Sequence, residues 1–161
     1  MKSRLNFMFL LAFLVPFQGC ASFANLGTKP SEFVNTGEKR LVGQDLKDAI
    51  VGKVYKAPLP FNFWYEVYRV DGNKFTINER TGKVAHGGTG IKYKITDDQL
   101  CMYLREWVCF SVYRRGPELA IFTEDDIAKD RSKGITTLST KYAEYANGSR
   151  EVALEFSLGR P

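Results

Sequence analysis

The sequence predicts a mainly β fold, an antiparallel meander that forms a small barrel or sandwich and is preceded by one short helix. Several segments alternate apolar and polar residues with a period of two, and turn residues separate them at intervals of about 8 to 12 residues. No strand–helix–strand alternation of the kind that builds a parallel sheet is apparent. The chain has 161 residues, 44% of them hydrophobic, which suffices for one core and is too short for two ordinary domains.

The helix is expected over residues 41–51. Apolar residues recur there at helical spacing, and Gly52 follows as a C-terminal stop. The apolar positions are Leu41, Val42, Leu46, Ala49 and Ile50.

Strands follow the helix. Residues 61–68 alternate, and Asp71-Gly72 then gives a hairpin turn into a strand over 74–78. Residues 91–95 alternate apolar residues with lysines, and Thr96 continues the polar positions. This strand is therefore expected to have one solvated face. Further strands are expected over 100–104, 107–114, 118–122, 135–138 and 152–158.

Two shorter signals lie near the end of the chain. Thr123 begins a sequence of capping-box form, which allows one helical turn. Asn147-Gly148 favours a hairpin turn.

Two cysteines fix the register of one predicted hairpin. If Arg105 is the centre of a three-residue loop, Cys101 lies directly opposite Cys109 and Tyr103 lies opposite Trp107. Opposed residues are close enough for a disulfide, with Cα atoms about 4.5 Å apart. A bridge that closes so short a loop contributes about 2.5 kcal/mol to stability on the chain-entropy model.

The two faces of this hairpin differ in character. One face is expected to be core and carries Leu100, Met102, Leu104, Val108, Phe110 and Val112. The other face carries the cysteines together with Tyr103, Trp107 and Tyr113. These aromatic residues form a candidate binding surface if they are exposed, and a second packing surface under the helix if they are buried.

The amino terminus has the layout of a secretory signal. Lys2 and Arg4 precede an unbroken apolar run over 7–17, and small residues follow. The run is about half the length of roughly 20 residues that a membrane-spanning helix needs. It therefore predicts a signal peptide, and not a transmembrane helix.

The segment Phe17-Gln18-Gly19-Cys20 resembles the lipobox of bacterial lipoproteins, in which a small residue precedes a lipidated cysteine. The resemblance implies a signal peptide over 1–19, lipidation of Cys20 and a membrane anchor through that lipid. Because no aspartate follows the cysteine, it also implies the outer membrane, facing the periplasm, within a bacterial cell envelope.

Cleavage after Ala24 is the alternative. Ser22-Phe23-Ala24 satisfies the small-x-small rule, which would give a signal peptide over 1–24 and a soluble periplasmic protein. Either processing step leaves Cys101 and Cys109 as an even pair, as expected in an oxidising compartment.

Two further segments complete the predicted organisation. Residues 20–38 are expected to be a tether, because they are polar and show no sustained period, and residues 39–161 to be a single β-rich domain. The order of elements over 41–122 is similar to that of small exported bacterial domains of uncharacterised function. This resemblance implies a compartment and a fold, and no catalytic residue. It rests on Asp71-Gly72, Gly87-Gly88, the segment 90–95, Leu100-Cys101 and Cys109-Phe110.

Few residues suggest chemistry. His86 is the only histidine, so neither a histidine-rich metal site nor a Ser-His-acid triad with a recognisable motif is expected, and no metal or cofactor is predicted. Three carboxylates, Glu66, Asp97 and Glu124, are candidates for a catalytic pair.

These observations favour an exported envelope protein that is lipid-anchored, has no enzymatic activity and binds a partner. The partner is an envelope protein or a small envelope ligand, held by the aromatic hairpin or the mouth or interior of a barrel. The alternative is a hydrolase that acts on envelope polymers through a carboxylate pair. Nucleic-acid binding is not expected, because the net charge is only +5 and the basic residues are interleaved with acids.

Overall fold

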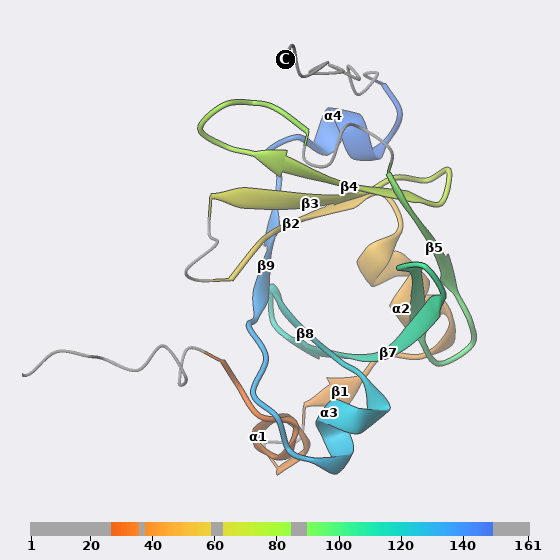
Figure 1. The fold of residues 1–161 in the computed structure, drawn as a ribbon, viewed down its shortest axis with the longest axis vertical. Coiled ribbons are helices and arrows are strands. Elements are labelled where there is room, and N and C mark those ends of the chain that lie inside the picture. The colour runs from red at the N-terminus through yellow and green to blue at the C-terminus, as the bar shows by residue number, and fades with distance from the viewer. Residues whose placement is uncertain (1–26, 36–37, 59–62, 85–89, 150–161) are drawn as a thin grey trace, which may run out of the picture.

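Eight antiparallel strands close into a barrel in the computed structural model, which describes residues 27–35, 38–58, 63–84 and 90–149 (Figure 1). The neighbours around the barrel run β7, β6, β5, β4, β3, β2, β9 and β8, and β8 pairs with β7 to close the ring. The predicted mainly β fold is confirmed, and closure makes it a barrel and not a sandwich. The strands are β2 (Lys53–Lys56), β3 (Trp64–Tyr68), β4 (Asn73–Asn78), β5 (Ile91–Ile95), β6 (Leu100–Tyr103), β7 (Trp107–Arg115), β8 (Glu118–Phe122) and β9 (Thr136–Ser139).

A short strand and four short helices accompany the barrel. Strand β1 (Lys39–Arg40) pairs with the end of β7. The helices are α1 (Pro30–Asn35), α2 (Gly43–Ile50), α3 (Glu124–Ala128) and α4 (Ala143–Ala146). No helix in the described part of the chain is long and apolar enough to cross a membrane.

The predicted first helix is confirmed as α2, and it closes one end of the barrel (Figure 1). Its Leu46, Ala49 and Ile50 are buried in the apolar cluster that fills the barrel interior. The Tyr55 hydroxyl on β2 donates a hydrogen bond to the Ala49 carbonyl at 2.5 Å, which ties the helix to the wall. Gly52 then leaves the helix with a φ of +69°, a conformation that glycine adopts without steric cost.

Two smaller apolar clusters lie on the outside of the barrel. Helix α4 covers the outer face of β2, β3 and β4, where Ala146 packs with Val67 and Ile77. Helices α1 and α3 lie on the outer face of β7 and β8 (Figure 1). The barrel is therefore covered on two sides and stoppered at one end.

The predicted turn of one hairpin and the predicted register of another are confirmed. Asp71-Gly72 connects β3 and β4, and Gly72 has a φ of +78°. The β6–β7 hairpin pairs Cys101 with Cys109 and Tyr103 with Trp107, as a three-residue loop requires. The cysteine sulfurs are bonded and their Cα atoms lie 4.0 Å apart.

Two expectations for the ends of the domain are wrong. Residues 30–35 belong to the folded unit and not to a tether, since they form α1 and bury Phe33 completely. Asn147-Gly148 ends α4, with Gly148 at a φ of +72°, instead of forming a hairpin turn. Cys20, His86 and the expected strand over 152–158 lie outside the described residues.

Candidate functional site

On β3, β7 and β8, the inward-facing side chains become more exposed from one end of the barrel to the other. On these three strands they are buried near α2 and half-buried toward the opposite end, whereas Met102 on β6, opposite Val108, stays buried. The buried members of β3, β7 and β8 are Tyr68, Val112 and Leu119, and the half-buried members of the same three strands are Glu66, Phe110 and Ile121.

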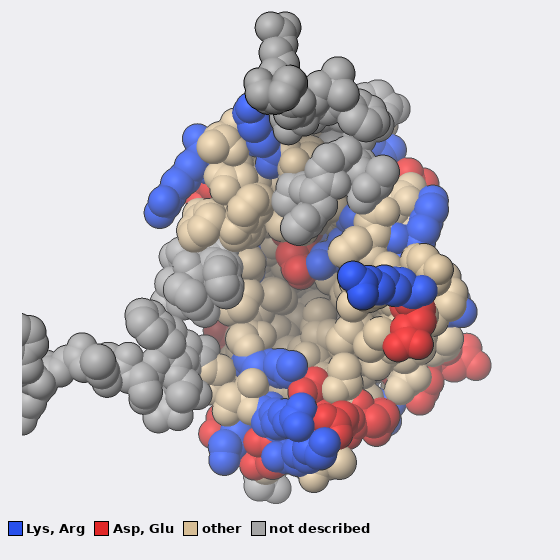
Figure 2. All heavy atoms as spheres, viewed as in Figure 1, with Lys and Arg blue, Asp and Glu red and all other residues tan. Residues whose placement is uncertain are grey.

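The half-buried end is the open mouth, which we define by the inward-facing residues Trp64, Glu66, Ile91, Val108, Phe110 and Ile121. In the view of Figure 1, the space-filling surface is hollowed at the centre of the ring of strands (Figure 2). The interior of an eight-stranded barrel is just wide enough to be filled by side chains or to hold one small ligand. The exposure of its apolar lining identifies the open mouth as the candidate binding site.

One ion pair lies on the inner wall between the buried end and the open mouth. The Lys74 ammonium and the Glu66 Oε1 atom are 2.5 Å apart, and the two side chains are only 9% and 22% exposed. The register of the β3–β4 hairpin places Tyr68 opposite Lys74 and Glu66 opposite Thr76, so Lys74 and Glu66 are diagonal neighbours on the inner face.

Tyr68 completes this polar cluster. Its hydroxyl donates to Glu66 Oε2 at 3.3 Å, and the Lys74 ammonium lies 5.6 Å from the centroid of its ring. Both carboxylate oxygens of Glu66 are thus engaged. Burial of the ion pair is tolerated because each charge has a close opposite partner.

The interior tyrosines are neutral hydrogen-bonding groups. Burial raises the pKa of Tyr68 well above its ordinary value of 10.0, and the nearby Glu66 carboxylate raises it further. Burial also raises the pKa of Tyr55 and of Tyr93 to about 12. These phenols therefore stay protonated at any physiological pH, which suits a packing and hydrogen-bonding role better than proton transfer.

The predicted aromatic surface divides into two parts. Tyr103 and Trp107 are 49% and 44% exposed at the tip of the β6–β7 hairpin, with ring centroids 5.6 Å apart. The Lys94 ammonium lies 4.3 Å from the centroid of Trp107. This tip stands beside the open mouth, because Trp107 directly precedes the inward-facing Val108 on β7. Leu104, expected on the core face, is instead 45% exposed at this tip.

Tyr113 does not belong to that surface, so the expected set of three is wrong in this member. Tyr113 is buried, with its ring centroid 6.3 Å from that of Phe33 on α1 and 5.9 Å from that of Phe122. The physical reason is α1, which covers this part of the outer face of β7. No periodic pattern in the sequence signalled a six-residue helix there.

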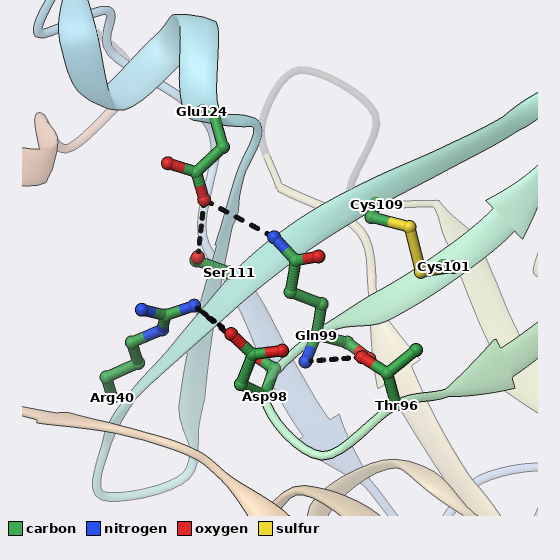
Figure 3. Close-up of a disulfide and its surroundings, with 8 residues drawn as sticks. All are labelled: Arg40, Thr96, Asp98, Gln99, Cys101, Cys109, Ser111 and Glu124. Atoms are coloured by element: carbon green, nitrogen blue, oxygen red, sulfur yellow. Dashed lines mark hydrogen bonds and ion pairs between the residues drawn. A yellow bond between two sulfur atoms is a disulfide. The ribbon is translucent and has the colours of Figure 1, made fainter.

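A group of polar side chains lies to one side of the disulfide (Figure 3). The Glu124 carboxylate accepts hydrogen bonds at 3.3 Å from both Gln99 and the buried Ser111. Arg40 forms an ion pair with Asp98 at 3.2 Å. These contacts fasten α3 and β1 to the β5–β6–β7 part of the wall, which makes a structural role the simplest account of them.

The candidate catalytic carboxylates lie on different parts of the molecule. Glu66 points into the barrel, whereas Glu124 lies on α3 outside it against Ser111. Asp97 is exposed in the β5–β6 turn, where its carbonyl accepts from the Gly43 N–H at the start of α2. The wall of the barrel therefore separates Glu66 from Glu124.

No group of three or more histidine, cysteine, aspartate or glutamate side chains suited to a metal ion occurs among the described residues. The cysteines at 101 and 109 are bonded to each other.

Comparison with models of protein families, with curated proteins and with solved structures finds no match for this chain. The open mouth and its buried ion pair are therefore the features from which a function has to be inferred.

Proposed function

We propose that this chain is an exported protein of a bacterial cell envelope that binds a small amphipathic ligand in the open mouth and has no enzymatic activity. The observation that carries the proposal is the change in burial along the inner face, from Val112 to Val108 on a single strand. Apolar side chains exposed inside a concavity lose contact with water when a ligand enters, which favours binding.

The proposed location rests on the sequence together with the disulfide. The amino-terminal segment has the layout of a signal peptide, and Gly19-Cys20 matches the end of a lipobox. We place the protein at the outer membrane, facing the periplasm and anchored by a lipid on Cys20, with a soluble periplasmic form cleaved after Ala24 as the alternative. A bonded cysteine pair on β6 and β7 fits an oxidising compartment.

The open mouth fits a binding function better than the carboxylates or the aromatic hairpin tip fit theirs. A carboxylate pair for glycoside-type hydrolysis needs two carboxyl groups about 5 to 9.5 Å apart across one cleft, and Glu66 and Glu124 lie on opposite sides of the barrel wall. Tyr103 and Trp107 offer an envelope protein only a small surface at the rim, without Tyr113.

The ligand site is tested by titration with N-phenyl-1-naphthylamine, an uncharged apolar dye whose fluorescence increases in an apolar environment. Ile121→Trp fills the open mouth and should weaken dye binding by about tenfold or more, equivalent to at least about 1.4 kcal/mol. Val70→Trp is the matched control, because Val70 is exposed in the β3–β4 turn outside the mouth. Equal weakening by both variants, or no dye binding by the unaltered protein, would refute the proposed site.

The anchor is tested by the intact mass of protein purified from the membrane fraction, measured without and then with reductant. A chain that starts at Cys20 and carries acyl groups, with a mass that rises by about two hydrogens on reduction, supports the anchored and disulfide-bonded form. A chain that starts at Asn25 would instead establish the soluble alternative.

A further inference from the structure

The chemistry of the open mouth constrains the ligand beyond its apolar character. Among the residues that define the open mouth, Glu66 is the one with a charge, and its charged neighbour on the same inner face is Lys74. The pair has no net charge, so it offers no long-range attraction for either an anion or a cation. Its value for a ligand depends on the hydrogen bonds that it can still form.

Both members of the pair keep capacity for hydrogen bonds. An ammonium group has three N–H donors, and the hydrogen bond of Lys74 to a described residue is to Glu66 Oε1. A carboxylate has about four lone-pair sites, and Glu66 accepts from Lys74 and Tyr68. One donor group and one acceptor group therefore lie side by side on the inner wall.

A charged head group would disturb this arrangement. A carboxylate or phosphate near Lys74 would also face Glu66, and an ammonium near Glu66 would also face Lys74. In either case the charged head group competes with one member of the Lys74–Glu66 pair for the other. One poorly solvated charge is then left uncompensated, which is strongly unfavourable. A hydroxyl or amide group has no such cost, because it can accept from Lys74 and donate to Glu66 while the ion pair stays intact.

We propose that the ligand of the open mouth is an amphiphile with an uncharged, hydroxyl- or amide-bearing head group, which bridges Lys74 and Glu66 while its apolar body contacts Phe110, Val108 and Ile121. This inference rests on the proposed function, since it names the class of molecule that the same site takes.

The test is competition against N-phenyl-1-naphthylamine with three amphiphiles that share a twelve-carbon chain, all kept below their micellar concentrations. They are 1-monododecanoylglycerol, dodecanoate and dodecyltrimethylammonium. We expect the uncharged glyceride to compete at a concentration about tenfold or more below that of either charged compound. Equal or tighter competition by a charged compound would overturn the inference.

Two variants show whether the ion pair sets the preference. Glu66→Gln keeps the shape of the side chain and leaves Lys74 as an uncompensated cation, so the preference should shift toward dodecanoate by about tenfold or more. The double variant Lys74→Met/Glu66→Leu replaces the pair by apolar groups of similar size, a change that buried pairs often tolerate. It should bind the dye and lose the preference for the glyceride. An unchanged preference in both variants would exclude the pair as its source.

Lys94→Met is the matched control for the lysine change, because Lys94 lies over Trp107 on the outer face. It should leave the order of the three competitors unchanged, and an altered order would contradict the assignment to Lys74. The two levels of inference fail differently. Absence of dye binding by the unaltered protein refutes the proposed function and the head-group inference together, whereas dye binding without a preference for the glyceride refutes only the latter.

Discussion

The two ends of the barrel are built from the same strands and the same inward-facing positions, yet they differ in burial. At one end Leu46 and Ile50 of α2 fill the space between the walls, and Val112 is inaccessible to solvent. At the other end no described helix enters the barrel. Val108, four residues before Val112 on the same face of β7, stays half-buried there. Strand periodicity determines which residues point inward, but the element at the barrel end determines whether they become core.

The outer face of β7 repeats this lesson. Tyr113 and Trp107 point to the same side of one strand, but α1 covers Tyr113 and leaves Trp107 exposed. We therefore expect the covered positions to carry stability, and the uncovered ones to contribute little to it.

The largest expected effect comes from removing a buried side chain at the barrel end that α2 closes. Leu46→Ala removes a completely buried side chain of α2 and should lower the free energy of unfolding by about 3 kcal/mol, within the range for buried leucine. Urea denaturation followed by circular dichroism measures it. Val42→Ala, at an exposed position just before α2, should change the value by less than about 0.5 kcal/mol. Similar losses in both would show that α2 does not fill the barrel end.

The disulfide staples the hairpin that borders the open mouth. Replacing both Cys101 and Cys109 with alanine should cost about 2.5 kcal/mol, from the entropy of a loop that the bond closes across a sequence separation of 8 residues. Hydrogen exchange should quicken most in β6 and β7 around the tip, and less in α2. Reduction of the unaltered protein serves as the control and should give the same pattern. Uniform acceleration through α2 would contradict a local role.

A matched pair of substitutions on β7 compares the two ends directly. Val112→Ala should cost about 2 kcal/mol, because it leaves a cavity in packed surroundings. Val108→Ala should cost less than about 1 kcal/mol, since its side chain is half-exposed in the open mouth. Both free energies of unfolding come from urea denaturation, and equal losses would contradict the gradient of burial.

The smallest expected effect on the free energy of unfolding comes from Asp126, in the helix α3 that covers part of the outer face, and it depends on pH. Burial alone would raise the pKa of Asp126, but hydrogen bonds from Thr123 and contact with Lys133 outweigh it and hold the pKa below its ordinary value of 3.8. Asp126 closes the capping box of α3, accepting from the Thr123 N–H at 3.0 Å.

Because the pKa is lower in the folded than in the unfolded protein, Asp126 stabilises the fold above its unfolded pKa of about 3.9. That contribution, about 1 kcal/mol for a helix cap, is lost as the pH falls through the folded pKa. Asp126→Asn should therefore lower stability at pH 7 and reduce the loss on acidification, as followed by urea denaturation at several pH values. Asp125→Asn, at a more exposed carboxylate paired with Lys129, should have a smaller effect. A larger effect at Asp125 would contradict this account of the cap.

Much of the fold could be predicted because its signals are local. Asp71-Gly72 indicated the turn between β3 and β4, and the spacing of Cys101 and Cys109 around Arg105 indicated the β6–β7 register. The same pairing places Lys74 and Glu66 on one face, but the alternation gave no sign that this face points inward, because the more apolar Tyr65 and Val67 lie on the other face, under α4.

Helices α1 and α4 could not be predicted in the same way. They have six and four residues, too few to show a period or to be stable alone, and they exist because their side chains pack on the barrel. The sequence by itself thus determined most of the strands, the β6–β7 register and the disulfide, since each depends on neighbours along the chain. Only the tertiary structure decided that the sheet closes, that α2 stoppers one end, and that Tyr113 is covered while Trp107 and the open mouth are not. Those outcomes depend on contacts between segments far apart in the chain, which no local pattern encodes.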